Sequence, residues 1–220
     1  MKKLMNIVTR LHKSTERDCL ARMNDDKVHC MSVARKFGKE FWDGDRRYGY
    51  GGYKYIPGRW KQAAQNLIEE YNLKEGSKIL DVGCGKGFLL KELLMLQPKL
   101  HVEGFDISKY AIENSHPDVK NNLYILDAKN KTKYVENEFD LVISLATFHN
   151  LRLYDLEQSL KEFERIGKQK YLMVEAYENI EQLFNMQCWA LTCNAFFSKD
   201  EWIWLFNKFG YTGDYEFIYF

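Results

Sequence analysis

Short apolar runs recur along the chain from about residue 78 onward, each beside turn-forming or charged residues. They predict six β-strands, at Lys78–Val82, Val102–Phe105, Leu123–Leu126, Phe139–Ser144, Tyr171–Val174 and Tyr215–Tyr219. Helix-length stretches lie between strands, at Phe88–Leu96, Lys109–Ser115 and Leu153–Ile166. Strands that alternate with helices predict a doubly wound α/β fold, in which a mostly parallel sheet carries helices on both faces.

The two ends of the chain carry different signals. Residues 1–40 are charged and helix-like, with apolar positions at mixed three-to-five spacing. Near the other end, Ser198 and Glu201 have the spacing of a capping box, which predicts an amphipathic helix that runs to about Phe209 and ends at Gly210. Because the chain has no repeat, no low-complexity linker and only three prolines, we expect one cooperative unit, with an N-terminal segment (1–60) before the main domain (61–220).

Composition narrows the class of protein. The chain is 45% apolar and 29% charged, as in a folded globular protein. Its net charge of +1 argues against nucleic-acid binding as the main role, because phosphate neutralisation needs a basic excess. Five cysteines without a C-x-x-C pair predict free thiols in a reducing compartment, hence a cytoplasmic protein. No apolar window approaches the ~18 residues of a membrane span, and the basic start lacks the apolar run of a secretory signal.

The clearest chemical signal is a glycine loop between the first long strand and the helix after it. Residues 79–88 read Ile-Leu-Asp-Val-Gly-Cys-Gly-Lys-Gly-Phe. Such glycines let the backbone turn tightly and approach a ligand, while the helix N-terminus points free N–H groups at it. Asp81 precedes the first glycine by two residues, and an acid there suits a cofactor with a cationic amino group better than a pyrophosphate. A turn without a ligand is the disfavoured alternative.

This D-x-G-x-G-x-G pattern resembles motif I of the class I S-adenosylmethionine-dependent methyltransferases. The residues 139–144, followed by Phe148-His149-Asn150, are closest to the small-molecule branch often called type 11. The resemblance runs from about residue 76 to residue 220 and implies S-adenosylmethionine as cofactor and a seven-stranded sheet with one antiparallel strand. Only about ten residues follow the last predicted helix, so we expect the terminal hairpin to be reduced. The first 60 residues match no general motif of the family.

The resemblance also implies where the cofactor binds. Asp106 would accept the ribose hydroxyls, and Asp127 with its neighbour would meet the adenine edge. The residues expected to contact the cofactor are Asp81, Gly83, Cys84, Gly85, Gly87, Asp106, Ile107, Asp127, Ala128 and Leu145. Taken alone, either Asp106 or Asp127 is more typical of a solvated loop or a helix cap. Their order along the chain, together with the glycine loop, favours the cofactor site.

The resemblance implies that the loop after the fourth strand, residues 144–150, faces the transferred methyl group. It lacks the Pro-Pro-aromatic signature of enzymes that methylate base amines, and the chain has no Pro-Cys nucleophile, so DNA and RNA bases are disfavoured. His149 is the candidate general base, because an ordinary pKa of about 6.5 suits proton transfer at neutral pH. The alternative for His149 is a residue that packs or caps the loop. Glu175 is a second candidate base, although a structural role or a distant pocket wall is more typical.

Residues 41–60 mix aromatic residues, glycines and arginines in a run that cannot form a regular helix. We expect this segment to be a lid over the cofactor cleft, with Tyr50, Tyr53 and Arg59 contacting the substrate. Arginines there suit a carboxylate or phosphate of the cofactor or acceptor. The alternative is an extension packed on the sheet with its arginines paired to acids nearby, namely Arg46 and Arg47 to Asp43 and Asp45.

Together these patterns predict methyl transfer from S-adenosylmethionine to an oxygen or nitrogen of a small, anionic metabolite or sugar intermediate, without a metal. The aromatic residues of 188–197 are expected either at the far side of the acceptor pocket or in the core. Two other functions stay open: a non-catalytic S-adenosylmethionine-binding partner of another enzyme, and a protein or tRNA methyltransferase. The second would need a basic patch on the lid face. The sequence does not indicate the oligomeric state.

Overall fold

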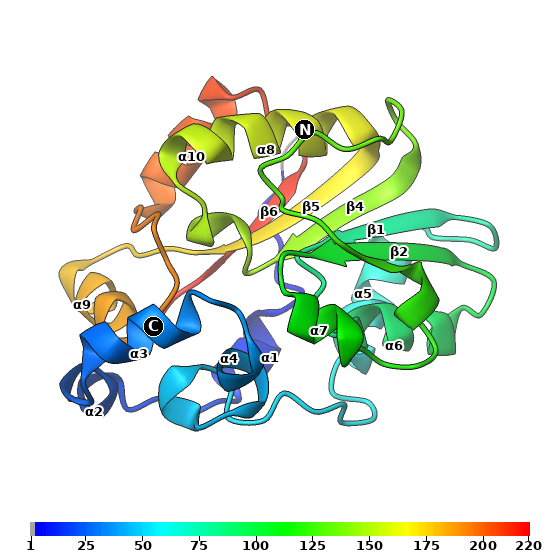
Figure 1. Cartoon of the computed structure of the whole chain (residues 1–220). Coiled ribbons are helices and arrows are strands. Elements are labelled where there is room, and N and C mark those ends of the chain that lie inside the picture. The colour runs from blue at the N-terminus through cyan, green and yellow to red at the C-terminus, as the bar shows by residue number, and fades with distance from the viewer. Residues whose placement is uncertain (1–2) are drawn as a thin grey trace.

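A six-stranded sheet forms the centre of the computed structural model, which describes residues 3–220 (Figure 1). Its strand order is β3-β2-β1-β4-β5-β6, and every neighbouring pair is parallel. The strands are β1 (Lys78–Val82), β2 (His101–Asp106), β3 (Leu123–Ile125), β4 (Phe139–Leu145), β5 (Gly167–Glu175) and β6 (Asp214–Ile218). The order reverses between β1 and β4, and ligands bind beyond the carboxyl ends of the strands at such a reversal.

Ten α-helices surround the sheet in the described part of the chain (Figure 1). Four short ones come first, α1 (Thr9–Lys13), α2 (Cys19–Asn24), α3 (Lys27–Ala34) and α4 (Lys39–Asp43). The others are α5 (Lys61–Glu70), α6 (Phe88–Leu96), α7 (Lys109–Glu113), α8 (Leu153–Ile166), α9 (Ile180–Trp189) and α10 (Lys199–Lys208). Short 3-10 helices lie at Arg46–Tyr48, Lys120–Asn122 and Phe148–Asn150.

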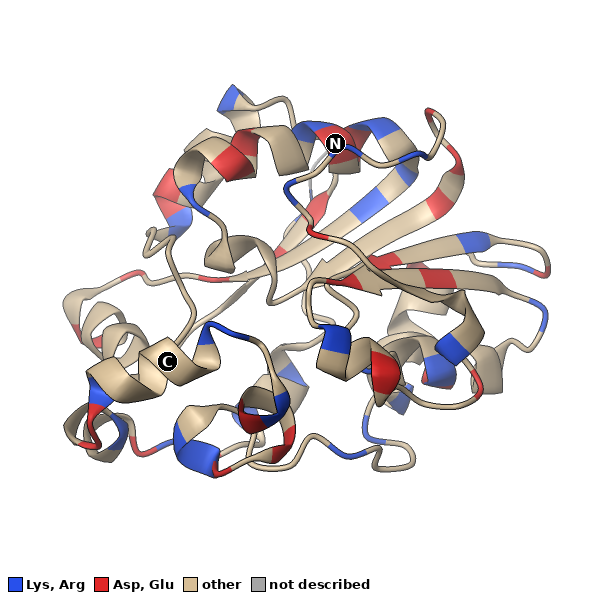
Figure 2. Cartoon of the chain, in the orientation of Figure 1, with Lys and Arg blue, Asp and Glu red and all other residues tan. Residues whose placement is uncertain are grey.

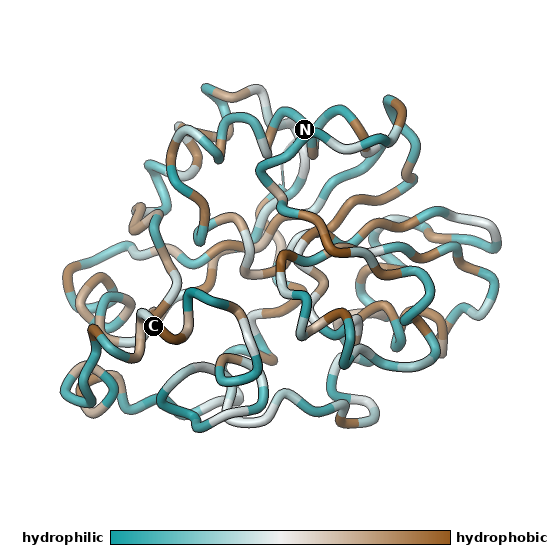
Figure 3. Tube along the Cα trace, in the orientation of Figure 1, coloured by the Kyte–Doolittle hydropathy of each residue, from teal (hydrophilic) through white to brown (hydrophobic). Residues whose placement is uncertain are grey.

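Two hydrophobic cores cover the two faces of the sheet. Successive strand residues point to opposite faces, so Ile79 of β1 enters one core and Leu80 the other. The first core includes Leu67 of α5 and Leu93 of α6, and the second includes Phe163 of α8 and side chains of α10. Figure 3 shows the hydrophobic segments gathered in the central strands and hydrophilic ones in the outer loops. The doubly wound α/β prediction is confirmed.

The sheet differs from the family pattern at its β6 edge. Within residues 3–220 it contains six strands and no antiparallel one, so the expected reduction from the seven-stranded family pattern is confirmed. Leu4 instead forms a parallel bridge with Tyr215, whose N–H donates to the Lys3 carbonyl oxygen. The start of the chain therefore covers the backbone groups that a seventh strand would pair.

A buried carboxylate fixes the N-terminal segment to the sheet. Glu216 of β6 is 1% exposed and accepts hydrogen bonds from the backbone N–H groups of Ile7, Val8 and Thr9, and from the Tyr171 and Thr9 hydroxyls. These N–H groups lie at the start of α1, where helices leave donors without internal partners. Glu216 thereby orients α1, whose residues Leu11 and His12 line the main cavity.

Some elements differ from their predicted forms. The capping box is confirmed, because the Glu201 N–H donates to Ser198 Oγ and the Ser198 N–H donates to Glu201 Oε2. Helix α9 was not predicted, since its apolar residues Ile180 and Phe184 are exposed and give no core-facing pattern. The division at residue 60 stays a prediction.

Candidate functional site

Two adjoining cavities open beyond the carboxyl ends of the strands. The larger has a volume of about 530 Å³ and includes the glycine loop, His149 and Glu175. The smaller has a volume of about 260 Å³ and includes Asp106 and Asp127. Both are lined by Phe41, Trp42, Tyr50, Gly83, Leu145, Ala146 and Asn150. The cavities therefore form one divided site at the reversal of strand order.

The glycine loop is shaped by close packing. Gly83, Gly85 and Gly87 all have positive φ angles, of 81°, 55° and 73°, which residues with a side chain rarely adopt. A Cβ atom on Gly85 would lie 2.9 Å from the Trp42 ring, so a side chain there would displace this ring. Cys84 is buried, and burial raises the pKa of its thiol well above the usual value. Cys84 thus contributes backbone and packing rather than a reactive thiolate.

Asp81 has an unsatisfied carboxylate beside the loop. The residue is 4% exposed, and its Oδ1 has no hydrogen-bond partner among the described residues. Burial, and then the nearby Asp106 charge, raises the pKa of Asp81 to about 8. A buried acceptor without a donor is costly, so this position fits a cationic donor from a ligand. The α-ammonium of S-adenosylmethionine is such a donor.

This geometry predicts proton release when the cofactor binds. At a pH of about 6.5 the carboxyl is mostly protonated, and an ammonium against it would lower its pKa and ionise it. We expect the wild type to release close to one proton per S-adenosylhomocysteine bound. The Asp81→Asn variant should release few protons and bind S-adenosylhomocysteine at least tenfold more weakly. Titration calorimetry in two buffers of different ionisation enthalpy measures this. Equal release by both proteins would contradict the role of Asp81.

Asp106 lies at the end of β2 with both oxygens anchored. The Gly85 N–H donates to its Oδ2 at 2.9 Å and the Ser108 N–H donates to its Oδ1 at 2.7 Å. Each carboxylate oxygen has a further lone pair. Asp106 lines the smaller cavity, so these lone pairs suit the paired hydroxyls of a ribose. Burial raises the pKa of Asp106, whereas the two backbone hydrogen bonds lower it.

The other expected adenosine contacts line the same smaller cavity. Ile107 is half exposed there, and Asp127 and Ala128 follow β3. The Asp127 carboxylate accepts from the Lys129 N–H and pairs with its ammonium at 3.0 Å. Leu145 ends β4 and lines both cavities, and its contact with the cofactor stays a prediction. All the proposed cofactor residues are thus brought to one site except Gly87, which packs against the core side chains Val119 and Leu123.

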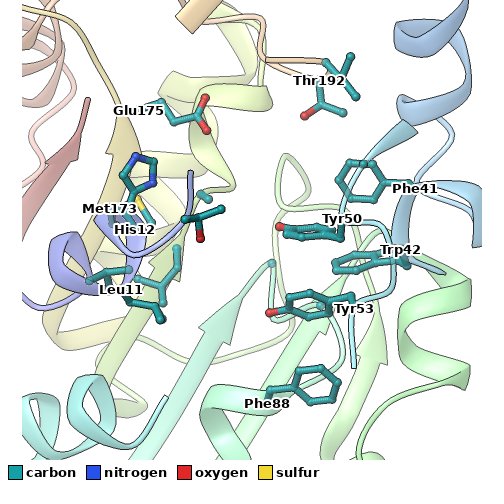
Figure 4. A pocket seen from close by; sticks show the side chains of 18 of the residues that line it. Leu11, His12, Phe41, Trp42, Tyr50, Tyr53, Phe88, Met173, Glu175 and Thr192 are labelled. Atoms are coloured by element: carbon teal, nitrogen blue, oxygen red, sulfur yellow. The ribbon is translucent and has the colours of Figure 1, made fainter. Parts of the chain in front are cut away.

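An aromatic wall from the N-terminal segment faces the strand ends. The rings of Trp42 and Tyr50 stack with centroids 5.2 Å apart, and Tyr53 lies 4.5 Å from Tyr50 and 5.0 Å from Phe88. Figure 4 shows these rings in a ladder on one side of the cavity, with Glu175 and His12 on the other. Arg59 lines this cavity too. Tyr50, Tyr53 and Arg59 therefore have access to a ligand, and their substrate contacts stay a prediction.

A charged clamp joins this wall to the glycine loop. Lys86 is 4% exposed, and its Nζ lies 2.8 and 2.7 Å from the two Asp43 carboxylate oxygens. Lys86 also donates to the Tyr53 carbonyl oxygen, and the Tyr53 N–H donates to Asp43. The clamp was not predicted, because Lys86 occupies a variable position of the loop motif. It fixes the aromatic wall to the residues expected to hold the cofactor.

The alternative expectation, in which the side chains of Arg46 and Arg47 pair with Asp43 and Asp45, is wrong. Asp43 is taken by Lys86, and Asp45 accepts from the Arg47 backbone N–H. The Arg47 side chain pairs instead with Asp25, at 2.6 Å. Arg46 remains on the cavity wall.

His149 and Glu175 form a pair on the opposite side. His149 is 3% exposed; its Nδ1 accepts from the Glu175 N–H at 3.2 Å, and its Nε2 lies 3.5 Å from Glu175 Oε2. Burial lowers the pKa of His149, although the Glu175 charge opposes this. A neutral imidazole that accepts at Nδ1 carries its proton on Nε2, directed at the carboxylate. The base roles of His149 and of Glu175, the second candidate, both stay predictions, and the structure shows that the two side chains form one pair.

Several residues of the larger cavity were missed in the sequence. They come from the N-terminal segment and from residue 220: Leu11, His12, Thr15, Arg17, Arg22 and Phe220. No local motif marks them, and the outermost two, Leu11 and Phe220, lie more than 200 residues apart in the sequence. Trp189, by contrast, belongs to the 188–197 cluster that was expected either at the far side of the acceptor pocket or in the core, and it lines this cavity. Within residues 3–220 no group of three or more His, Cys, Asp or Glu side chains could hold a metal ion. That same range contains no helix of the length and hydrophobicity needed to cross a membrane.

Comparisons with known proteins identify the family of the chain. Residues 73–210, more than half of the chain, match a family model described as a methyltransferase domain. The chain therefore belongs to the methyltransferase family, whose cofactor is S-adenosylmethionine, and its sheet has the class I fold. A SAM-dependent methyltransferase structure from Aquifex aeolicus shares the fold, with a TM-score of 0.51 and 24% identity over 71% of this chain and 84% of that one.

Similar proteins differ in the acceptors that their names state. A malonyl-[acyl-carrier protein] O-methyltransferase of Bacillus cereus is 26% identical over 160 residues, which cover 64% of this chain and 58% of that protein. A ribosomal RNA small subunit methyltransferase C of Buchnera aphidicola is 34% identical over 110 residues, covering 48% and 31%. The chain spans less than two thirds of the length of these relatives.

Proposed function

We propose that this methyltransferase transfers the methyl group of S-adenosylmethionine to an oxygen or nitrogen of a small, anionic metabolite. The observation that carries the proposal is the larger cavity. It extends from the glycine loop to Glu175, and its volume of about 530 Å³ lies within the usual size of small-molecule sites. Residues 41–60 lie over it as the proposed lid, and the clamp between Lys86 and Asp43 keeps them against the glycine loop.

The relatives support a small acceptor only in part. A malonyl-[acyl-carrier protein] O-methyltransferase and a demethylmenaquinone methyltransferase of Thermotoga maritima, the latter 24% identical over 67% of this chain and 61% of that protein, are among them. The ribosomal RNA relative favours a second candidate, an RNA acceptor. Lys, Arg, Asp and Glu all occur along the N-terminal helices, so the lid side is not uniformly basic (Figure 2). This mixture favours the small acceptor.

The residues of the cavity suit the chemistry of methyl transfer. S-Adenosylmethionine supplies an electrophilic methyl on a sulfonium, and the enzyme aligns the acceptor and excludes water. The Glu175 carboxylate faces the cavity (Figure 4) and is backed by the imidazole of His149. We propose that this pair removes the acceptor proton. In this proposal Glu175 contacts the acceptor, and His149 orients the Glu175 carboxylate.

This role predicts an asymmetry between two variants. Glu175→Gln is expected to lower kcat about 100-fold without changing the Kd of S-adenosylhomocysteine, because a general base contributes in the chemical step. His149→Asn is expected to lower kcat less, about tenfold, since the carboxylate remains. Transfer of isotope-labelled methyl to an acceptor found by screening small phosphates and carboxylates measures both. A larger loss in His149→Asn than in Glu175→Gln would assign the base to His149 instead.

The same screen tests the proposed function itself. Label in a small molecule supports it, whereas label in added RNA or protein would replace it with the corresponding macromolecular acceptor. Saturable binding of S-adenosylmethionine with no transfer to any class would favour the non-catalytic alternative. The ribosomal RNA and unfractionated protein are therefore included as acceptors beside the small molecules.

A further inference from the structure

Three arginine side chains gather around one tryptophan in the larger cavity. The guanidinium carbons of Arg17, Arg22 and Arg46 lie 5.5, 4.0 and 5.0 Å from the centre of the Trp189 ring. The Arg17 guanidinium also lies 5.4 Å from the ring of Phe220. Guanidinium groups that stack on aromatic faces keep their N–H edges free for planar recognition of an oxyanion.

None of the three arginines has an ion pair with a carboxylate within residues 3–220. Arg22 donates to the carbonyl oxygens of Arg46 and Gly49, and Arg46 also donates to that of Gly49. Arg17 donates to two backbone carbonyl oxygens and lies 3.1 Å from His12 Nδ1, while its Nε has no hydrogen-bond partner among the described residues. Backbone carbonyls satisfy some N–H groups, but no carboxylate of residues 3–220 lies within ion-pair distance of the three guanidiniums. The more distant charges of Glu175 and Asp25 raise the pKa of Arg17 and of Arg22 without offsetting the lowering by burial.

Bringing these charges together is unfavourable without a ligand. Burial, and then the Arg46 charge, lowers the pKa of Arg22 to about 10. Burial also lowers the pKa of Arg17 and of Arg46. Such shifts mean that the protonated forms are destabilised by desolvation and mutual repulsion. An anion among the three guanidiniums would remove this repulsion.

The charge balance of the whole cavity agrees with an anionic occupant. Among the described residues its lining includes five Lys or Arg side chains and two side-chain carboxylates, those of Asp81 and Glu175. S-Adenosylmethionine does not correct the excess, because its sulfonium and ammonium outnumber its carboxylate. The acceptor is therefore the molecule that supplies the missing negative charge.

We propose that Arg17, Arg22 and Arg46, stacked on Trp189, bind an oxyanion group of the methyl acceptor, a carboxylate or a phosphate. The inference rests on the proposed function and adds the group by which the acceptor is recognised. Glu175 lies in the same cavity, so an acceptor held by its anionic end would present its nucleophilic atom toward the pair of Glu175 and His149.

The test uses the whole protein saturated with S-adenosylhomocysteine and two probes, inorganic phosphate and malonate, titrated at constant ionic strength. We expect saturable binding of at least one probe to the wild type. Arg17→Gln/Arg46→Gln is expected to raise the probe Kd at least about tenfold, since charge-assisted hydrogen bonds are lost. Arg22 is left intact because it supports the backbone of residues 46–49.

Matched variants separate this inference from the proposed function. Arg10 is exposed on α1 and does not line the cavity. Arg10→Gln removes one positive charge there and is expected to leave the probe Kd unchanged. Arg46→Lys keeps the charge and is expected to retain part of the binding. If S-adenosylhomocysteine binds all variants equally but neither probe binds, or the double variant binds them as the wild type does, the inference is overturned. If S-adenosylhomocysteine itself does not bind, the proposed function fails first.

Discussion

Asp106→Ala is expected to weaken the binding of S-adenosylhomocysteine about 100-fold. The carboxylate ends β2 in the smaller cavity and is held by the N–H groups of Gly85 and Ser108. Removing it would delete the acceptor of the ribose hydroxyls and leave two buried N–H donors unpaired. Charged hydrogen bonds contribute about 1.5–3 kcal/mol each, and 1.4 kcal/mol is tenfold in Kd. Titration calorimetry on the purified variant gives the ratio directly.

Two comparisons make the Asp106 result interpretable. Asp106→Asn keeps the shape and one acceptor oxygen, so we expect an intermediate loss of about tenfold with an unfolding temperature near the wild type. Asp140→Ala removes an aspartate near the other end of the sheet, where it accepts from the Lys78 N–H and pairs with Lys168, and should not change the Kd. Equal affinity of Asp106→Asn, Asp106→Ala and the wild type would remove Asp106 from the ribose site.

Asp43→Asn is expected to lower the free energy of unfolding by about 3 kcal/mol. The change leaves the Lys86 ammonium, whose side chain is 5% exposed, without its carboxylate. An uncompensated buried charge costs about 3–5 kcal/mol, and the partial exposure of Asp43 places the value at the lower end. Because Tyr53 is held by both members of the clamp, we also expect about tenfold weaker binding of S-adenosylhomocysteine. Urea unfolding and calorimetry measure the two effects.

The ion pair between Asp25 and Arg47 is the matched control for the clamp. It belongs to the same N-terminal segment, but its side chains are 47% and 33% exposed. Asp25→Asn should therefore change the free energy of unfolding by less than about 1 kcal/mol and leave cofactor binding unaffected. A similar loss in both variants would mean that the clamp acts only as a surface ion pair, and unchanged affinity in Asp43→Asn would separate the aromatic wall from the cofactor site.

The cofactor half of the site could be predicted because its signals are local. The turn from β1 into α6 requires positive φ angles at Gly83, Gly85 and Gly87. Because these glycines lie within five residues of one another, the sequence shows the turn directly. Asp81 and Asp106 are tied to strand ends, which short apolar runs reveal. The parallel sheet follows from the same alternation. What the sequence left open was the sheet edge, where Leu4 takes the place of a missing strand.

The acceptor half could not be predicted because it is assembled from distant segments. Arg17, Arg22 and Trp189 meet only when α2 packs against α9, a helix without a core-facing apolar pattern. The orientation of His149 depends on the Glu175 N–H, a contact across two elements that no spacing encodes. The loop motif does not specify the residue at position 86, so the ion pair of Lys86 with Asp43 is seen only in the folded structure. Tertiary packing, rather than propensity, determines these positions.

The most direct test of the central claim follows the methyl group itself. The wild type and Asp106→Ala are incubated with methyl-labelled S-adenosylmethionine and a mixture of small phosphates, carboxylates, RNA and protein, and the products are separated by molecular mass. We expect label in the low-mass fraction with the wild type and a strong reduction with Asp106→Ala. Label confined to RNA or protein, or no label although S-adenosylmethionine binds, would contradict it.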